Sequence, residues 1–299
     1  MLGPISGAPH FVQPYGEKYK EALGKYISEV EKDLNSGLWP NVSYARIDKS
    51  FMPGLVESAN QSKPGLNLIY AEDPGVMLDK LREAINNGTE SERYIANLGD
   101  DGVHFAAFDY RLIDGTSSLL MFEPVNFNAM GALMLSWRVQ RALEGGGYGR
   151  DVKFYAIAMD IQRSCSECGI FSLALAKKLH KESDPITELH RMNSVGSISF
   201  INDPPSSPID FDKLVPPSLY KHTQSRGRLT KYIESNPGSD AIQVNKKGDT
   251  LLDRQMQHMQ TIVEKDPLFN TEQTMRLVNS IHQKRLVELK QLMKILNDE

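Results

Sequence analysis

The sequence predicts a mixed α/β protein of the α+β kind, with a central sheet and helices at both ends of the chain. Short apolar runs alternate with segments of helical periodicity between residues 66 and 179, and the dipeptide Asp114-Gly115 separates two apolar runs at hairpin spacing. The 299 residues are 40% hydrophobic and 24% charged, which is ordinary globular composition and excludes a disordered or collagen-like chain.

The N-terminal part is predicted to begin with an unstructured segment followed by a helix. Residues 1–16 lack the basic start and the apolar stretch of a general secretion signal, and we expect them to form a disordered delivery signal. Residues 17–34 place apolar side chains every three or four positions, as an amphipathic helix does, within an expected helical segment at 17–60. No apolar run approaches the roughly 18 residues that a membrane span needs, so none is expected.

Residues 61–204 are predicted to form the central domain, in which strands and helices alternate. The glycine-rich stretch 145–149 is expected to end a helix, because it lacks the Gly-Lys-Ser/Thr of a phosphate-binding loop. The expected strands are 66–71, 103–112, 117–125 and 152–160, and the expected helices are 76–85, 127–144 and 169–179.

Residues 205–299 are predicted to be a mostly helical C-terminal part. Proline-rich breakers near residue 205 mark its start, and two long helices are expected at about 248–264 and 272–297. The net charge of −4 argues against a nucleic-acid partner. Residues 220–247, however, contain six basic and two acidic side chains, so we expect this segment to attract anions.

The expected hairpin brings a histidine close to a carboxylate. If Asp114 and Gly115 form the two-residue turn, Glu123 lies opposite Ala106 and diagonally across from His104. One hairpin face is expected to pack on the core and the His104 face to open to a site. A carboxylate that holds one imidazole nitrogen leaves the other available as a general base, whereas the alternative is a half-buried structural histidine.

The two cysteines, Cys165 and Cys168, lie between a polar turn and an expected helix. The Ser164 to Glu167 spacing matches a capping box, so backbone amides should point near the Cys168 sulfur and favour its thiolate. Cys168 is therefore a candidate nucleophile, and an inert buried cysteine or a Cys-x-x-Cys redox pair is the alternative. Histidine spacing does not fit a zinc site, so no metal is expected, and the low cysteine content indicates a reducing environment.

The residues around these candidates resemble the YopJ family of bacterial type III effector acetyltransferases. The run 160–179 (DIQRSCSECGIFSLALAKKL) is similar to the nucleophile motif of that family. The tripeptides at 102–104 (GVH) and 122–124 (FEP) resemble its histidine and acidic motifs, and 220–224 (YKHTQ) resembles a C-terminal motif. The resemblance covers roughly residues 20 to 255, and Cys165 departs from it, because relatives carry a small polar residue there.

This resemblance implies a core similar to the ubiquitin-like-protein protease type of cysteine protease, with a mostly helical regulatory part at both ends. It implies ping-pong transfer from acetyl-CoA to Ser, Thr or Lys side chains, with inositol hexakisphosphate as activator. Lys221 also resembles a lysine on which some relatives acetylate themselves. The implied catalytic residues are His104, Glu123 and Cys168, with Gln162 in the oxyanion hole, and the implied contacts to CoA or activator phosphates are Arg163, Ser164, Lys221, His222 and Arg226.

The resemblance also implies partners and a place of action. The expected targets are host MAP kinase kinases or related kinases, in which acetylation would block phosphorylation and so innate immune signalling. The expected route is a bacterial type III system into the host cell cytoplasm, with a secretion chaperone or the apparatus as a further partner. A cysteine protease or deubiquitinase of the same fold type is the alternative, since the same triad can hydrolyse an amide. A non-catalytic protein that binds a kinase is the third possible function.

Overall fold

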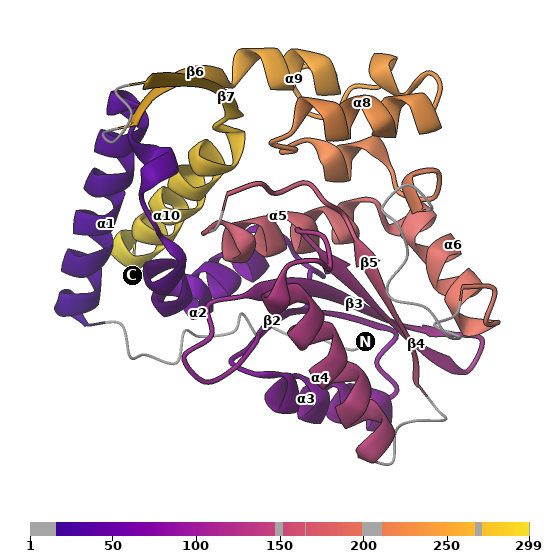
Figure 1. Cartoon of the computed structure of the whole chain (residues 1–299). Helices are drawn as coiled ribbons and strands as arrows, with labels where there is room; N and C mark the ends of the chain where they lie inside the picture. The colour runs from indigo at the N-terminus through magenta and orange to yellow at the C-terminus, as the bar shows by residue number, and fades with distance from the viewer. Residues whose placement is uncertain (1–15, 147–151, 165, 199–210, 267–270, 299) are drawn as a thin grey trace, which may run out of the picture.

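The computed structural model describes residues 16–146, 152–164, 166–198, 211–266 and 271–298. A five-stranded sheet lies in the middle of the molecule, with helices on both sides (Figure 1). The two outer pairings, β1 with β2 and β4 with β5, are parallel, and the two inner ones are antiparallel. In sheet order the strands are β1 (Leu68–Ala71), β2 (Ser91–Asn97), β3 (Phe105–Ile113), β4 (Thr116–Glu123) and β5 (Val152–Ala158).

The hairpin of β3 and β4 confirms the expected turn and its register. Asp114 and Gly115 have φ angles of 49° and 82°, and a type I′ turn requires positive φ at both central positions. Ala107 pairs with Phe122, so the last residue of β4, Glu123, lies next to the start of β3. The turn chemistry alone was sufficient to predict this pairing.

Both faces of the sheet are covered, so the prediction that the His104 face opens to a site is wrong. Phe105 and Ala107 enter one hydrophobic core, and Ala106 and Phe108 enter a second core on the opposite face. His104 directly precedes β3 and lies where the strands end. The covering helices are α5 (Cys168–Lys181) on the first face, and α3 (Pro74–Asn86) and α4 (Met130–Gly145) on the second.

Several elements whose bounds were not predicted complete the fold. Strand β2 lies in the sheet between β1 and β3, although it was not expected. The helix at 45–62 lies almost entirely within the segment 17–60 that was expected to be helical, although its bounds were not predicted, and Pro53 lies inside it. The additional elements are α2 (Ala45–Ser62), α6 (Ser183–Ser194), α8 (Arg226–Ser235) and three short 3-10 helices at Trp39–Asn41, Pro217–Tyr220 and Ser239–Ala241.

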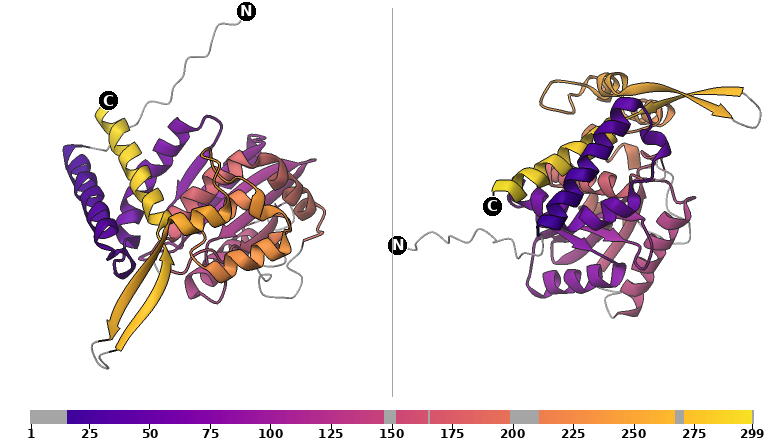
Figure 2. Two further views of the ribbon diagram at one scale, coloured as in Figure 1. Left: turned by 90° about the horizontal axis from the view of Figure 1, so that it is seen from above. Right: turned by 90° about the vertical axis from the view of Figure 1, so that its left-hand side faces the viewer.

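The prediction of a long helix at 248–264 is wrong. The chain forms the short helix α9 (Leu251–Gln257), and an antiparallel hairpin of β6 (Met259–Asp266) and β7 (Thr271–Val278) follows it. The β-branched run at 261–263 (TIV) favours a strand over a helix. This hairpin projects from the body of the molecule (Figure 2). The second expected helix is present only from residue 280 onward, as α10 (Ser280–Asp298).

The two ends of the chain pack together. Helix α1 (Glu17–Ser36) confirms the expected N-terminal helix and lies beside α10 (Figures 1 and 2). Side chains of α1, α2, α5, α8 and α10 belong to one hydrophobic core. The expected boundary near residue 205 and the segment 1–15 lie outside the described residues, so the division into domains stays a prediction. Within the described ranges, no helix has both the length and the apolar character needed to cross a bilayer.

Candidate active site

His104 and Glu123 meet at the end of the β3–β4 hairpin, as predicted. His104 Nε2 lies 2.9 Å from Glu123 Oε2, with the carboxylate fully buried and the imidazole 15% exposed. The other carboxylate oxygen, Oε1, accepts a hydrogen bond of 3.1 Å from the backbone N–H of Val125. Glu123 is therefore held at both oxygens, and the ring nitrogen Nδ1 of His104 remains for a further partner.

Cys168 is the first residue of α5 and lies beside this histidine. Its sulfur is 3.2 Å from the carbonyl oxygen of Val103, and its side chain hydrogen-bonds that of His104. Burial lowers the pKa of His104, but the charge of Glu123 and the hydrogen bond with Cys168 outweigh burial and raise this pKa to about 10. The ring is then protonated at neutral pH, and an imidazolium beside the sulfur favours the thiolate.

The expected capping box before α5 does not form. The N-cap residue is Glu167, and no side chain caps the helix there. Ser166 Oγ donates to the Glu167 carboxylate, and Ser164 Oγ donates to Gln224 Oε1 at 3.0 Å. Neither serine side chain therefore caps the N-terminus of α5, and its positive end is left to act on the Cys168 sulfur. The second thiol, Cys165, lies outside the described residues.

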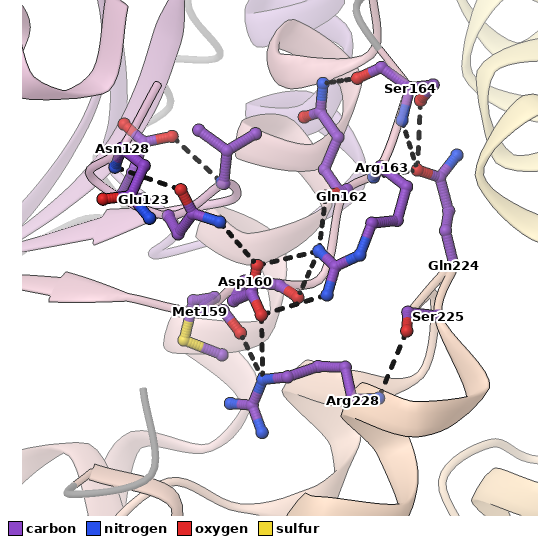
Figure 3. A network of polar contacts seen from close by, with 12 residues as sticks. Glu123, Asn128, Met159, Asp160, Gln162, Arg163, Ser164, Gln224, Ser225 and Arg228 are labelled. Atoms are coloured by element: carbon purple, nitrogen blue, oxygen red, sulfur yellow. Dashed lines mark hydrogen bonds and ion pairs between the residues drawn. The ribbon is translucent and has the colours of Figure 1, made fainter. Parts of the chain in front are cut away.

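Gln162 lies on the loop that joins β5 to α5 (Figure 3). Its backbone N–H donates to the carbonyl of Pro124 at 3.0 Å, which ties the loop to the residue after Glu123. Its side-chain Nε2 donates to the Ser164 carbonyl at 2.6 Å, and its buried Oε1 has no hydrogen-bond partner. The loop before Cys168 thus starts at the end of β5, beside the end of β4 that carries Glu123.

Gln224 links this loop to the C-terminal part of the chain, a role that the sequence analysis did not predict. Its Oε1 accepts three hydrogen bonds, from Arg163 N at 2.6 Å, Ser164 N at 3.1 Å and Ser164 Oγ at 3.0 Å (Figure 3). Its backbone N–H donates to the Ile161 carbonyl at 2.9 Å. Gln224 closes the YKHTQ motif at 220–224, so the presence of that motif was the available signal.

Arg163 and Ser164, both expected to contact CoA or activator phosphates, bond to the protein itself. The Arg163 guanidinium forms an ion pair with Asp160, at 2.8 Å from Oδ1 and 3.0 Å from Oδ2. Ser164 is held by Gln224 through both its backbone and its hydroxyl. The Arg163 side chain is 37% exposed, so it can also be reached from solvent.

Lys221 belongs to a group of cations that the sequence analysis found only in part. The strongest charges acting on Lys221 come from Lys178 of α5, Arg254 of α9 and Lys284 of α10. Burial, followed by these charges, lowers the pKa of Lys221 to about 8. Burial and the nearby Lys181 likewise lower the pKa of Lys178 to about 8. We call Lys178, Lys221, Arg254 and Lys284 the basic cluster; their mutual repulsion makes it a site that favours an anion.

The other basic residues of 220–247 lie in different surroundings. His222 is buried at the edge of the basic cluster, with Nδ1 3.1 Å from Ser280 Oγ, and burial and the neighbouring cations lower its pKa well below the usual value. Arg226 is exposed at the start of α8 and is not among the strongest charges on Lys221. Arg228 is buried and pairs with Asp212 at 2.6 and 2.7 Å. The structure therefore groups Lys221 and His222, and leaves Arg226 apart.

Comparison with known proteins identifies the family. The family model described as YopJ Serine/Threonine acetyltransferase matches residues 23–291. The chain belongs to the YopJ family of serine/threonine acetyltransferases. It is 39% identical to the serine/threonine-protein acetyltransferase YopJ of Yersinia pestis, over 99% of this chain and all of that protein. It is 22% identical to HopZ1a of Pseudomonas syringae pv. syringae, over 94% of this chain and 84% of the relative.

Solved structures of similar proteins have the same fold. A deletion variant of AvrA, solved with inositol hexakisphosphate (IP6) and CoA, is 35% identical, with a TM-score of 0.83 over 92% of this chain and 98% of that one. HopZ1a in complex with IP6 and CoA is 20% identical, with a TM-score of 0.69 over 92% and 98% of the two chains, a likeness of fold. The mixed α/β architecture of this YopJ-family chain is thus shared along nearly its whole length.

Proposed function

We propose that this YopJ-family enzyme transfers the acetyl group of acetyl-CoA to protein side chains in two steps, through an acetylated Cys168. The observation that carries the proposal is the meeting of Cys168, His104 and Glu123 at one end of the sheet. A buried carboxylate holds an imidazole, which in turn hydrogen-bonds a thiol at a helix start. This is the arrangement of a nucleophile, its general base and the group that orients the base.

In the first step, the Cys168 thiolate attacks the thioester carbonyl of acetyl-CoA. The new S–C bond converts the carbonyl into a tetrahedral oxyanion, which collapses and expels the CoA sulfur. The His104 imidazolium gives its proton to that leaving sulfur, and Glu123 keeps the ring oriented throughout. Acetyl-cysteine, free CoA and neutral His104 result.

In the second step, His104 Nδ1 removes the proton from an acceptor hydroxyl or amine as the acceptor attacks the acetyl-cysteine. Collapse of the second tetrahedral intermediate releases the Cys168 thiolate and leaves His104 protonated, as at the start. The first backbone amides of α5 and Gln162 are the proposed oxyanion donors. One Gln162 Nε2 hydrogen already bonds Ser164, so the second is the one available to the oxyanion.

For the activator, we propose that inositol hexakisphosphate binds the basic cluster and His222. A six-phosphate anion needs several cations at once, and the basic cluster supplies them from different elements of the fold. AvrA and HopZ1a, two similar proteins, were solved with IP6 and CoA, which supports both ligands for this chain. Arg163, Ser164 and Arg226 stay proposed contacts to CoA or activator phosphates. With a pKa of about 8, Lys221 is partly neutral near pH 7, which suits autoacetylation.

The proposed acceptors are host MAP kinase kinases or related kinases, acetylated on Ser or Thr hydroxyls or on Lys. Acetylation of a hydroxyl converts its oxygen into an ester, so a phosphate can no longer be attached there, and innate immune signalling is blocked. Delivery by a bacterial type III system into the host cytoplasm, with a chaperone or the apparatus as partner, belongs to the same proposal. The support is family membership, with 39% identity over the full length of YopJ.

A cysteine protease or deubiquitinase of the ubiquitin-like-protein protease type is the second candidate, because water in place of the acceptor would make the same three residues hydrolytic. The basic cluster favours acetyl transfer, since peptide hydrolysis requires no phosphate-bearing donor or activator. A non-catalytic kinase binder would not need the hydrogen-bonded His104–Glu123 pair.

The test is transfer of radiolabelled acetyl from acetyl-CoA to purified MAP kinase kinases, with and without inositol hexakisphosphate. We expect label on the kinase and, without kinase, thioester-linked label on the enzyme. Cys168→Ala and His104→Ala should abolish both signals, whereas Lys231→Ala, which changes an exposed α8 lysine outside the basic cluster, should leave them intact. Cleavage of a ubiquitin-like fusion without any acetyl transfer would establish the protease instead.

A further inference from the structure

A buried ion network lies directly behind the nucleophile. Arg285 of α10, Asp48 of α2 and Glu167, the N-cap residue of α5, have side chains that are at most 1% exposed. Arg285 Nε lies 3.1 and 3.2 Å from the two Asp48 oxygens, and Nη2 lies 2.9 Å from Oδ2. The same Nη2 is 3.7 Å from Glu167 Oε1. Three distant segments therefore meet at the residue that precedes Cys168.

His282, one turn earlier on α10, faces the same carboxylate. Arg285 Nη1 donates to His282 Nδ1 at 2.8 Å, and because arginine only donates, the ring proton resides on Nε2. His282 Nε2 lies 3.5 Å from Glu167 Oε1. The ring packs against Trp39, with ring centroids 4.2 Å apart. Two side chains of α10 are thus directed at Glu167.

A different side of the first turns of α10 faces the basic cluster. Ser280 Oγ lies 3.1 Å from His222 Nδ1, and Lys284 is among the strongest charges on Lys221. Residues 280 and 284 are one turn apart and lie on the same side of the helix. Helix α10 therefore contacts the proposed anion site with one side and the residue before the nucleophile with another.

We infer that Glu167 is a positioning residue for Cys168, held in place by Arg285 and His282, so that the docking of α10 sets the reactivity of the nucleophile. This inference rests on the proposed function, because it takes Cys168 as the reacting group. The Glu167 carbonyl accepts the Phe171 N–H at 2.9 Å, so Glu167 belongs to the first turn of α5. A displacement of its side chain is transmitted to Cys168 through one peptide bond.

The anion site is connected to Glu167 by the same helix. An anion in the basic cluster would attract Lys284 and restrain the turn that carries Ser280, and this turn also carries His282. Helix α2 connects this network to the loop before His104. Its Asp48 pairs with Arg285. The next residue, Lys49, donates a hydrogen bond of 2.8 Å to the carbonyl of Gly102, which lies in that loop. Helix α2 thus contacts the loop before His104, and α10 contacts the residue before Cys168.

The test is the alkylation rate of Cys168 by iodoacetamide, measured by mass spectrometry from about pH 5 to 9, with and without inositol hexakisphosphate. All proteins carry Cys165→Ser, so that iodoacetamide can alkylate Cys168 alone. Glu167→Gln keeps the shape of the side chain and removes its charge. The matched control is Lys290→Gln, which removes an exposed α10–α1 ion pair with Glu31. Thermal unfolding of each protein verifies that it is folded.

We expect Glu167→Gln to slow alkylation about ten-fold, to reduce the response to inositol hexakisphosphate, and to lower kcat with little change in KM. Lys290→Gln should behave as the parent protein. His282→Phe, which keeps a ring against Trp39 but loses both nitrogens, should behave as Glu167→Gln, whereas His282→Gln, which keeps an N–H, should restore part of the rate.

Equal alkylation in Glu167→Gln, His282→Phe and Lys290→Gln would overturn the inference while leaving Cys168 as nucleophile. If the parent thiol itself reacts no faster than free cysteine at pH 7, the proposed catalytic role fails, irrespective of Glu167. The two failures are therefore distinguishable. Should Glu167→Gln not fold, the pair of His282 variants decides the question by itself.

Discussion

Gly131 lies so close to His104 that any side chain at this position would overlap the imidazole. A Cβ on Gly131 would be 2.9 Å from His104 Cγ and 3.2 Å from Nδ1. Gly131 is the second residue of α4, so the first turn of α4 packs against one side of the imidazole. Because Glu123 restrains the ring at Nε2, the imidazole is held from two directions.

Gly131→Ala is expected to reduce kcat for acetyl transfer about 100-fold, because a displacement of the base by about 1 Å costs roughly that factor. Gly145→Ala is the matched control, since it lies in the same helix and its Cβ would meet nothing within 4 Å. The control should keep wild-type kcat. Steady-state kinetics of both variants is the measurement, and a fully active Gly131→Ala would show that the ring is not confined by α4.

Glu123→Gln is expected to lower kcat by about 10²- to 10⁴-fold, which is the rate factor that general acid–base catalysis usually contributes. The charge of Glu123 is the main cause that raises the pKa of His104 against burial, so the variant ring loses its proton at lower pH. Alkylation of Cys168 at pH 7 should then become slower. Iodoacetamide alkylation as a function of pH measures this change, and an unaltered pH profile would contradict the role of Glu123.

The charge of His104 is expected to stabilise the fold in a defined pH window. Its pKa is 6.5 ordinarily and about 10 in the folded protein, so the folded state binds the extra proton between these values. The stabilisation is complete below pH 6.5 and is lost as the pH rises towards 10. Thermal unfolding of wild type and His104→Gln should show a difference in Tm that shrinks along this range. A difference independent of pH would refute the assignment.

Binding of inositol hexakisphosphate is expected to take up protons near pH 8. Lys178 and Lys221 each have a pKa of about 8, and a bound polyanion favours their charged forms. Affinity should therefore decrease as the pH rises above 8. Calorimetry in buffers of different ionisation enthalpy measures the proton uptake, and binding without proton uptake would exclude these lysines from the site.

Lys221→Met is expected to weaken binding of inositol hexakisphosphate by about 10- to 100-fold, the value of one charge-assisted hydrogen bond. Without the ligand, the variant should unfold at the same or a higher temperature, because repulsion within the basic cluster decreases. Lys231→Met provides the control outside the basic cluster. Binding that Lys221→Met leaves unchanged would argue against this site.

Gln224→Leu is expected to reduce the free energy of unfolding by about 1–3 kcal/mol, because buried donors of the loop before the nucleophile lose their acceptor. Since Gln162 lies on that loop, kcat should fall more than KM rises. Gln224→Glu keeps an acceptor oxygen and should retain most of the activity. Denaturant unfolding and kinetics measure both effects, and equal behaviour of the two variants would contradict the proposed hydrogen-bonding role.

The β3–β4 hairpin and helix α5 could be predicted because their signals are local. The turn dipeptide at 114–115 specifies which residues of β3 and β4 face each other, and apolar periodicity after Cys168 specifies a helix. Local signals failed where several patterns compete. The residues of β6 and β7 fit helical spacing as well as strand composition. The capping box before α5 does not form because the hydroxyls of Ser164 and Ser166 bond to Gln224 and Glu167 instead.

Local sequence signals predicted the proposed reacting groups: backbone geometry within about 20 residues brings Glu123 to His104 and starts a helix at Cys168. What surrounds these groups depends on long-range packing. Asp48 and Arg285 are 237 residues apart, and the basic cluster draws on three helices and the turn that carries Lys221. Such contacts form because folding buries distant surfaces against each other, and no local pattern specifies which of these surfaces will meet.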